Sequence, residues 1–273
     1  MIDGRTQLYG VMGNPVHHSL SPIIHNGAFK RLGLNAVYLA FEVQDLKEAV
    51  RGIRGLGLCG VSVTMPFKTA VIPYLDRLDP TAEKIQSVNT ITNRQGLLTG
   101  HSTDGRGAVE ALEGKIPLRG KRVFLLGAGG AARAMAFSLK ERGCAIALFN
   151  RSADKGLALA KELGIEFTAL PSPSLGGWKA EVIINATSVG MHPHEDQSPI
   201  AQEDLKPGVT VMDIVYRPLR TRLLKEAENQ GCQTIDGLEM LARQGAAQFE
   251  IWTGLRPEIE PIKKDLRQVL IER

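Results

Sequence analysis

The stretch Val123 to Gly143, VFLLGAGGAARAMAFSLKERG, restricts the fold more than any other part of this chain. An apolar run typical of a buried strand meets the glycines Gly127, Gly129 and Gly130, and a helical pattern begins at once. A strand, a tight turn and a helix in this order belong to the βαβ rhythm of a parallel sheet. Gly127 permits the tight turn, and Gly129 lets backbone N–H groups approach a ligand. The stretch therefore predicts a Rossmann-like unit.

The glycine cluster, G-A-G-G-A-A, is a variant of the dinucleotide-binding fingerprint, with Ala132 where a third glycine often stands. The small side chain allows the helix to pack closely on the strand, and the helix N-terminus offers partial positive charge to a pyrophosphate. Tight strand-to-helix turns without a ligand use the same residue types, and this alternative stays open. The predicted pyrophosphate site consists of Gly127, Ala128, Gly129, Gly130 and Ala131.

The end of the next strand, near residue 150, selects between the two nicotinamide cofactors. An NAD enzyme places an acid there to grip the ribose 2′-hydroxyl. This chain has Asn150, Arg151 and Ser152, followed by Lys155. A carboxylate would repel a 2′-phosphate, whereas Arg151 can fork against it and Lys155 adds a charge, so NADP is favoured over NAD. The alternative is that both are ordinary charges in the first turn of a helix capped by Ser152.

The length of 273 residues suits two domains with a cleft between them rather than one core. Strand and helix patterns alternate from residue 8 to 65, a hairpin ends near His101, and strands resume near residues 121–127, 144–150, 181–186 and 209–216. We expect a two-domain α/β fold. An open α/β substrate domain would span residues 1–104, a Rossmann-like domain residues 105–237, and C-terminal helices at 238–273 would complete the first domain.

Two serines lie at the start of a predicted helix in GNPVHHSLSPIIHN. Ser21 with Pro22 forms an N-cap and first-turn pair, which alone could explain Ser21. Ser19 precedes the cap and has no capping role of its own. Two hydroxyls beside free N–H groups at a helix start could hold a carboxylate.

Lys68 follows a strand in GVSVTMPFK that ends at Thr64, where Pro66 forces the chain out of the sheet. Open α/β sheets bind ligands at the carboxyl ends of their strands, and Lys68 is expected at that edge. A lone lysine after a strand is usually a solvated charge, so this one needs partners. Candidates are Asn89 in SVNT and Asp104 in HSTDG.

Nine motifs, in this order and spanning most of the chain, resemble the shikimate dehydrogenase family of the aromatic amino acid pathway: GNPVHHSLSPIIHN, GVSVTMPFK, SVNT, STDG, GAGGAAR, NRS, INATSVGM, MDIVY and DGLEMLARQGA. The resemblance implies reversible reduction of 3-dehydroshikimate to shikimate with NADPH, in two α/β lobes that close over the cleft. Lys68 would donate a proton to the developing alkoxide, with Asp104 orienting it.

The resemblance also implies individual roles. Lys68 and Asp104 would form the catalytic pair, and Ser19 and Ser21 would hold the substrate carboxylate. The full implied substrate site is Ser19, Ser21, Thr64, Lys68, Asn89, Asp104, Tyr216 and Gln244. The implied nicotinamide contacts are Thr187, Ser188, Gly237 and Met240.

Two departures bear on substrate preference. Ser62 stands where the family usually has Asn before V-T-x-P-x-K, and Ser102 stands where Asn often precedes T-D-G. Both side chains stay polar but reach less far. One alternative is therefore a quinate/shikimate dehydrogenase with relaxed substrate or cofactor use, and another is a non-catalytic NADP-binding regulator.

Composition narrows the partners to a small molecule. A net charge of +4 is far below the clustered charge of a nucleic-acid binder. The sequence has no apolar run of membrane-spanning length and no leader, so we expect a cytoplasmic protein, as monomer or homodimer. Cys59, Cys144 and Cys232 are expected as buried thiols.

A metal site is not expected. His192, His194 and Glu195 lie close together in GMHPHED, but this segment is predicted as a Pro-containing loop. Zinc normally binds three or four ligands that converge from a firm scaffold.

Overall fold

The structure is a computed structural model that describes residues 2–170 and 179–271. The chain forms two compact units. Unit 1 comprises Met1–Asp104 and Ala242–Arg273, and unit 2 comprises Gly105–Leu241. The segment SPSLGG at residues 172–177, which its glycines, proline and serines predict to be a loop, lies outside the described residues.

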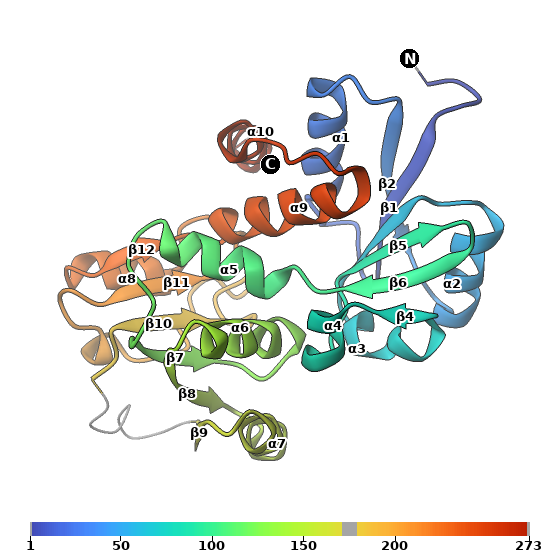
Figure 1. Ribbon diagram of the computed structural model, residues 1–273. Coiled ribbons are helices and arrows are strands. Elements are labelled where there is room, and N and C mark those ends of the chain that lie inside the picture. The colour runs from blue at the N-terminus through green and yellow to red at the C-terminus, as the bar shows by residue number, and fades with distance from the viewer. Residues whose placement is uncertain (1, 171–178, 272–273) are drawn as a thin grey trace. The chain divides into compact units, whose positions relative to one another are not determined.

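Unit 1 is built on a mixed six-stranded sheet (Figure 1). The order across the sheet is β2 (Ala36–Glu42), β1 (Gln7–Gly13), β3 (Gly60–Val63), β5 (Thr90–Arg94), β6 (Leu97–His101) and β4 (Arg77–Leu78). β1 pairs in parallel with both β2 and β3, as the strand and helix alternation predicts. The predicted hairpin is confirmed, because β5 and β6 are antiparallel and join through a two-residue turn at Gln95 and Gly96, both with positive φ.

Helices cover both faces of this sheet because side chains alternate between the faces along each strand. On β1, Val11 packs in the cluster with α1 and α9, and Met12 packs in the cluster with α2 and α4. The C-terminal helix α10 lies against α1, where Arg31 pairs with Asp265 at 2.5 Å. The elements around the sheet are α1 (Ser21–Arg31), α2 (Leu46–Gly55), α3 (Phe67–Ala70), η1 (Ile72–Tyr74), α4 (Pro80–Ile85), α9 (Gly237–Thr253) and α10 (Ile259–Ile271).

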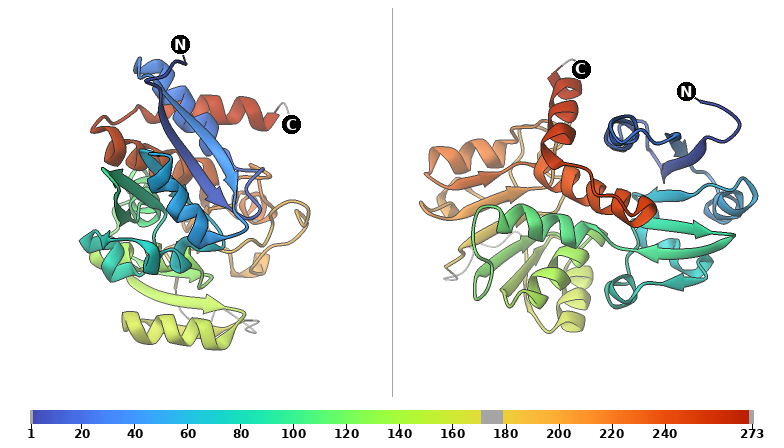
Figure 2. Two further views of the ribbon diagram at one scale, coloured as in Figure 1. Left: turned by 90° about the vertical axis from the view of Figure 1, so that its right-hand side faces the viewer. Right: turned by 45° about the horizontal axis from the view of Figure 1, so that its top comes forward.

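Unit 2 is built on a six-stranded sheet in which every pairing is parallel (Figures 1 and 2). The order is β12 (Gln233–Ile235), β11 (Thr210–Asp213), β10 (Val182–Asn185), β7 (Arg122–Leu126), β8 (Ala145–Asn150) and β9 (Glu166–Ala169). Numbered from β7, this is the doubly wound order 3-2-1-4-5-6, whose direction reverses between β7 and β10. The predicted Rossmann-like fold is confirmed.

The helical elements of unit 2 bury its sheet on two sides. One apolar cluster includes Leu125 of β7 and Met135 of α6, and a second includes Phe124 of β7 and Leu224 of α8. Strands β9 and β12 were not predicted, because short strands with exposed residues carry little periodic signal. The elements are α5 (Asp104–Glu113), α6 (Gly130–Glu141), α7 (Ala153–Leu163), η2 (Gln202–Asp204) and α8 (Arg222–Asn229).

The helix α1 starts at Ser21 with Pro22 in its first turn, as predicted, but the predicted cap roles of Ser21 and Ser19 were wrong. Leu20 holds the N-cap position and Ser21 is the first helical residue. Ser19 does have a local role, because its Oγ accepts a hydrogen bond from the Ser21 backbone N–H at 3.3 Å. A serine two residues upstream can thus satisfy a free N–H at a helix start.

The thiol prediction was right for one cysteine only. Cys144 is buried, whereas Cys59 and Cys232 are half-buried. All three are free. Burial raises the pKa of the Cys144 thiol to about 11.

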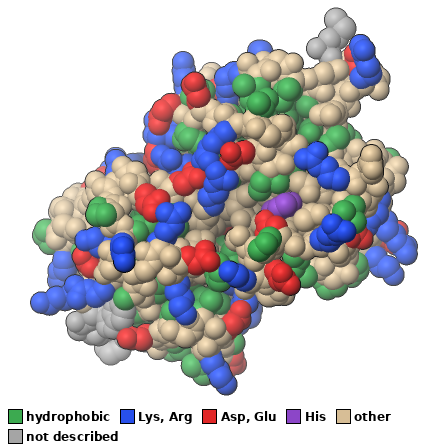
Figure 3. Space-filling view, in the orientation of Figure 1, with side chains coloured by type: hydrophobic (Ala, Val, Ile, Leu, Met, Phe, Trp, Pro, Cys, Tyr) green, Lys and Arg blue, Asp and Glu red, His purple; other side chains and the backbone are tan. Residues whose placement is uncertain are grey.

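On the face drawn in Figure 3, acidic and basic side chains are interspersed rather than gathered by sign. None of the described helices has the length and apolar character to cross a membrane. The segment with His192, His194 and Glu195 is a loop, in which His192 Nδ1 lies 2.9 Å from Glu195 Oε1. Within residues 2–170 and 179–271, no cluster of three or more His, Cys, Asp or Glu side chains is arranged to hold a metal ion.

Candidate functional site

The site in unit 1 lies at the carboxyl ends of β1 and β3. These parallel strands end side by side, with Met12 opposite Val63. The segments that follow stay close, since the Asn14 backbone N–H donates to Met65 O at 3.1 Å. A Cβ on Gly13 would lie 2.4 Å from Thr64 Cγ2, so this position has no room for a side chain. The sheet edge therefore gathers both predicted substrate motifs.

Lys68 and Asp104 meet at this edge. Lys68 lies on α3, and Asp104 is the first residue of α5. Lys68 Nζ donates to Asp104 Oδ2 at 2.5 Å. The Lys68 side chain is 19% exposed and that of Asp104 is 6% exposed, so the pair is shielded from most of the solvent. An ion pair in such a position interacts more strongly than one at the surface, and each charge depends on its partner.

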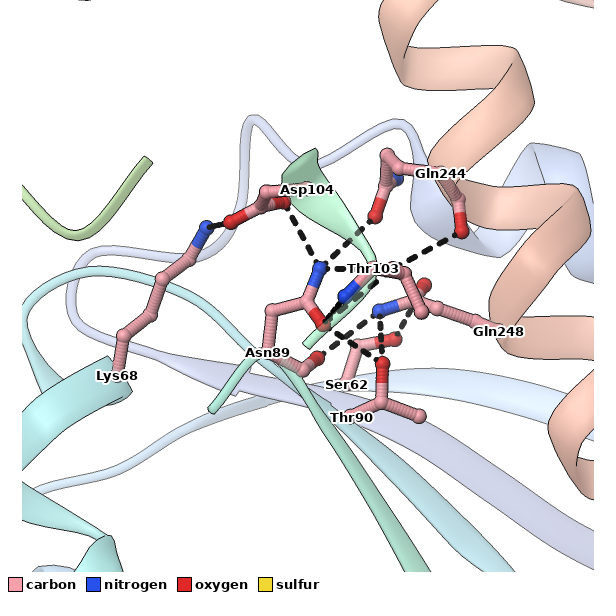
Figure 4. A network of polar contacts seen from close by, with 8 residues as sticks. All are labelled: Ser62, Lys68, Asn89, Thr90, Thr103, Asp104, Gln244 and Gln248. Carbon is pink, nitrogen blue, oxygen red and sulfur yellow. Dashed lines mark hydrogen bonds and ion pairs between the residues drawn. The ribbon is translucent and has the colours of Figure 1, made fainter. Parts of the chain in front are cut away.

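Asn89 is the centre of the hydrogen bonds around this pair (Figure 4). Its Nδ2 donates to Asp104 Oδ1 at 2.8 Å and to Thr103 Oγ1 at 2.9 Å, and Gln244 Oε1 lies 3.3 Å away. Its Oδ1 accepts from the Thr103 backbone N–H at 2.9 Å and from Thr90 Oγ1 at 2.8 Å. The amide is thereby held with its NH₂ toward the carboxylate.

The structure brings together most of the substrate residues predicted in unit 1. Lys68, Asn89, Asp104 and Gln244 form one connected group. Thr64 directly follows β3, at the carboxyl end of that strand. Ser21 is buried at the start of α1.

Tyr216, the remaining predicted substrate residue, follows β11 of unit 2. Burial raises the pKa of its phenol.

The two departures from the family pattern differ in their surroundings. Ser62 is 4% exposed, and its hydroxyl accepts from Tyr38 OH at 2.6 Å and donates to Gln248 Oε1 at 3.0 Å. This side chain is therefore engaged inside unit 1. Ser102 Oγ is buried and has no hydrogen-bond partner among the described residues.

Sequence reasoning missed Thr90, Thr103 and Gln248, which complete the shell around Asn89. A signal existed for Gln248, because it lies four residues beyond Gln244 on one predicted helix and so shares its face. Thr90 and Thr103 are sequence neighbours of predicted residues, but nothing in their local pattern distinguishes them.

The glycine turn of unit 2 has the geometry that a dinucleotide needs. Gly127 has a φ of 112°, and a Cβ there would lie 2.9 Å from Ala186 O. Gly129 precedes α6 as its N-cap residue, with an ordinary φ of −82° and nothing within 4 Å of an added Cβ. Neither strain nor packing in the protein requires a glycine at Gly129, and open space remains in front of the helix N-terminus. These residues fit a pyrophosphate.

The end of β8 fits a 2′-phosphate. Arg151 is exposed, and no acidic residue occupies positions 150–152. Asn150 Nδ2 donates to Ser152 O at 2.8 Å, which shapes the turn into α7. Ser152 holds the N-cap position of α7 but makes no side-chain cap hydrogen bond, and Lys155 lies in the first turn. The guanidinium and the ammonium can therefore approach an anion beside this turn.

Buried polar side chains hold the loop after β10 in place through hydrogen bonds. Asn185 Oδ1 accepts from the backbone N–H of Thr187 at 3.1 Å and from its Oγ1 at 2.7 Å. Asn185 Nδ2 donates to Asp213 Oδ1 at 2.9 Å. Burial raises the pKa of the Asp213 carboxyl to about 6, against the opposing effect of hydrogen bonds from Val215 and Thr221.

Two more predicted nicotinamide residues lie at the start of α9, and Ser188 is exposed on the loop after β10. A Cβ on Gly237 would lie 2.5 Å from Val215 O, so the close packing of α9 on the segment after β11 requires glycine. Met240 is buried within the core of unit 2.

The fold and the two groups of residues define a class: a two-unit α/β protein that pairs a dinucleotide-type unit with a unit carrying a shielded lysine–carboxylate pair. Matches to family models cover most of the chain. They are the shikimate dehydrogenase substrate binding domain at residues 11–91, shikimate / quinate 5-dehydrogenase at residues 110–239 and the shikimate 5'-dehydrogenase C-terminal domain at residues 237–267. The chain belongs to the shikimate dehydrogenase family.

Individual relatives agree over nearly the whole length. The shikimate dehydrogenase (NADP(+)) of Thermococcus kodakarensis is 52% identical over 262 residues, covering 94% of this chain and 95% of that protein. A solved shikimate dehydrogenase in complex with NADP+ is 43% identical, with a TM-score of 0.94 over 99% of this chain and 98% of its own. The shikimate 5-dehydrogenase of Thermus thermophilus in complex with NADP(H) and shikimate is 39% identical, with a TM-score of 0.90 over 96% and 99%.

Proposed function

We propose that this chain is an NADP-dependent shikimate dehydrogenase, an oxidoreductase that reversibly reduces 3-dehydroshikimate to shikimate. The observation that carries the proposal is the Lys68–Asp104 pair, 2.5 Å apart and shielded from solvent, at the strand ends of a unit that matches the family's substrate-binding domain. Unit 1 is accordingly the substrate domain and unit 2 the NADP domain.

NADP would be held in unit 2 by residues around the turn after β7 and the end of β8. The backbone N–H groups at the start of α6 bind the pyrophosphate, and Arg151 with Lys155 binds the 2′-phosphate. When bound, the cofactor supplies or accepts the hydride. The proposed cofactor residues are Gly127, Ala128, Gly129, Gly130, Ala131, Asn150, Arg151, Ser152, Lys155, Thr187, Ser188, Gly237 and Met240.

The substrate is bound and protonated by residues of unit 1. Tyr216, in unit 2, stays a proposed substrate residue on the family resemblance alone. Ser19 and Ser21 bind the carboxylate, and Thr64, Asn89 and Gln244 bind hydroxyl groups.

During reduction of the ring ketone, Lys68 Nζ donates its proton to the developing alkoxide, which needs both a proton and a positive charge nearby. Asp104 orients the ammonium through Oδ2, while its Oδ1 is held by Asn89. In the reverse direction Lys68 accepts the proton of the alcohol.

We further propose that the protein works in the cytoplasm, as a monomer or homodimer, with small molecules as its partners. Its three free cysteines fit a reducing compartment.

The experiment that tests the function follows NADPH oxidation by its loss of near-ultraviolet absorbance, with 3-dehydroshikimate near neutral pH. Lys68→Ala should lower kcat by at least about 10²-fold with a smaller effect on KM. The matched control is Lys47→Ala, which removes an exposed lysine from α2 of the same unit and should leave kcat unchanged. Near-normal turnover by Lys68→Ala would remove this lysine from the chemistry.

Two other outcomes point to the alternatives. Oxidation of quinate with kcat/KM close to that for shikimate would identify a relaxed quinate/shikimate dehydrogenase. NADPH binding in a calorimeter without turnover of either substrate would identify a non-catalytic binding protein.

A further inference from the structure

Beside Asn89, on the side away from Lys68, lies a group of buried side chains that has no part in the roles proposed above (Figure 4). Gln248, on α9, is 2% exposed. Its Nε2 donates to the backbone carbonyl of Asn89 at 2.9 Å and to Thr90 Oγ1 at 3.0 Å. Its Oε1 accepts from Ser62 Oγ at 3.0 Å. All of these residues belong to unit 1.

A backbone carbonyl fixes which way the Gln248 amide points. Asn89 O can only accept, so the end of the amide 2.9 Å away must be the NH₂ group. Oε1 is then left for the Ser62 hydroxyl, which itself accepts from Tyr38 OH. Because burial raises the pKa of Tyr38, the phenol keeps its proton and remains a donor.

Gln248 in turn fixes the hydroxyl of Thr90. Thr90 Oγ1 accepts from Gln248 Nε2, so its single proton is directed at Asn89 Oδ1, 2.8 Å away. The Thr103 backbone N–H donates to the same oxygen. With Oδ1 held by two donors, Nδ2 of Asn89 faces Asp104 Oδ1.

We propose that Thr90 and Gln248 are positioning residues for the Lys68–Asp104 pair, because they orient the Asn89 amide so that it donates to Asp104. The effect on turnover rests on the proposed function, whereas the orientation itself does not. A donor aimed at a carboxylate favours its charged form, so loss of that donor makes the carboxylate easier to protonate. In the described part of the chain, Lys68 is the ionisable partner of Asp104, and the nearby His101 is engaged by Asp79 and Thr92.

The test is Thr90→Val, which removes the hydroxyl and keeps the shape of the side chain. We expect kcat to fall about tenfold, and KM to stay within about threefold of the wild-type value. In the plot of kcat against pH, the acid limb should move upward by about one pH unit, as expected when one hydrogen bond to a charged group is lost. Thr90→Ser keeps the hydroxyl, so this variant should have the wild-type kcat and the wild-type acid limb. The matched control Thr253→Val removes a hydroxyl bonded to Phe249 O elsewhere on α9 and should move neither.

A second variant shows whether both residues act through one link. Gln248→Met should shift the acid limb in the same direction by less than Thr90→Val, because the Thr90 proton becomes free to turn without being lost. The double variant should shift it no further than Thr90→Val alone, since residues that act in series are not additive.

A readout that needs no turnover follows the side-chain amide signals of Asn89 by ¹⁵N NMR. In Thr90→Val its NH₂ protons should exchange with water at least about tenfold faster than in the wild type, because the amide is no longer held. A folded Thr90→Val protein with unchanged Asn89 signals and an unmoved acid limb would overturn the proposal. If wild type does not turn over 3-dehydroshikimate, the function fails while this measurement still decides the positioning. If Thr90→Val does not fold, Gln248→Met carries both readouts.

Discussion

His25 should make unit 1 unstable in mild acid. It lies on α1 and is 0% exposed, with its ring centroid 4.4 Å from that of Tyr38 and 5.0 Å from that of Trp252. Burial lowers the pKa of the imidazole from 6.5 to about 3, although Gln248 opposes the shift. The folded protein therefore keeps this histidine neutral at every pH near physiological.

The magnitude follows from the two pKa values. Below pH 6.5 the unfolded chain binds a proton at His25 and the folded chain does not, so the free energy of unfolding falls as pH falls toward 3. Between pH 7.5 and pH 5 this one group should cost about 2 kcal/mol, from 1.36 kcal/mol per pKa unit. Such a loss is a large fraction of the stability of an ordinary domain.

His25→Phe keeps an aromatic ring among Tyr38, Phe249 and Trp252 but removes the titration. Urea unfolding is followed by the fluorescence of Trp252, in a Trp178→Phe background, at pH 7.5 and pH 5. Both ring nitrogens of His25 are buried and have no hydrogen-bond partner among the described residues, and Phe replaces them with carbon. The substitution can therefore change the stability at every pH, so the readout is the change between the two pH values within each protein. That change should be about 2 kcal/mol smaller for His25→Phe than for wild type.

The control is His18→Gln, which removes an exposed histidine from the same unit and should keep most of the wild-type pH dependence. The reasoning is refuted if His25→Phe loses as much stability as wild type between the two pH values. In that case another group is responsible, or the imidazole is protonated in the folded state.

Two further predictions concern unit 2. Arg151→Glu should lower kcat/KM for NADPH by about 10- to 10²-fold, because a charge-assisted hydrogen bond is lost. The preference for NADPH over NADH should therefore become smaller. An unchanged ratio of the kcat/KM values for NADPH and NADH would exclude Arg151 from 2′-phosphate binding. Asp213 has a pKa of about 6 in the folded protein, against an ordinary value of 3.8. Its contribution to the free energy of unfolding is therefore complete below pH 3.8 and is lost as the pH rises through 6. Between pH 5 and pH 7 the free energy of unfolding of unit 2 should fall by about 1 kcal/mol, and Asp213→Asn should abolish this fall. Hydrogen exchange of the β11 amides measures the change. An equal fall in the variant would contradict the assignment of the titration to Asp213.

Contiguous sequence determined the Rossmann-like unit. The apolar run of β7, the turn at Gly127 and the start of α6 are neighbours along the chain, and backbone sterics and side-chain periodicity act over such short distances. The hairpin of β5 and β6 was predicted for the same reason. The short strands β9 and β12 were not predicted, because three or four residues are too few to show a clear alternation of apolar and polar side chains.

Candidate site residues could be named from motifs, but their mutual geometry could not. Lys68 and Asp104 are 36 residues apart, and Gln244 is 155 residues from Asn89. Thr90 pairs with His101 across the hairpin, and this register places Asn89 beside Thr103. No local rule predicts that contact, because it depends on how strands pair.

The same limit explains the errors in the cap assignments of Ser19 and Ser21, and it applies to Ser62 as well. A serine hydroxyl can cap a helix or bond to another side chain, and the sequence shows only that the hydroxyl is there. Which partner each hydroxyl takes depends on which atoms lie within about 3 Å. For Ser62 those atoms belong to Tyr38 and Gln248, which reach it from β2 and α9. Sequence thus set the elements and the chemical groups, and tertiary packing set which groups touch, because a hydrogen bond requires closeness in space and not along the chain.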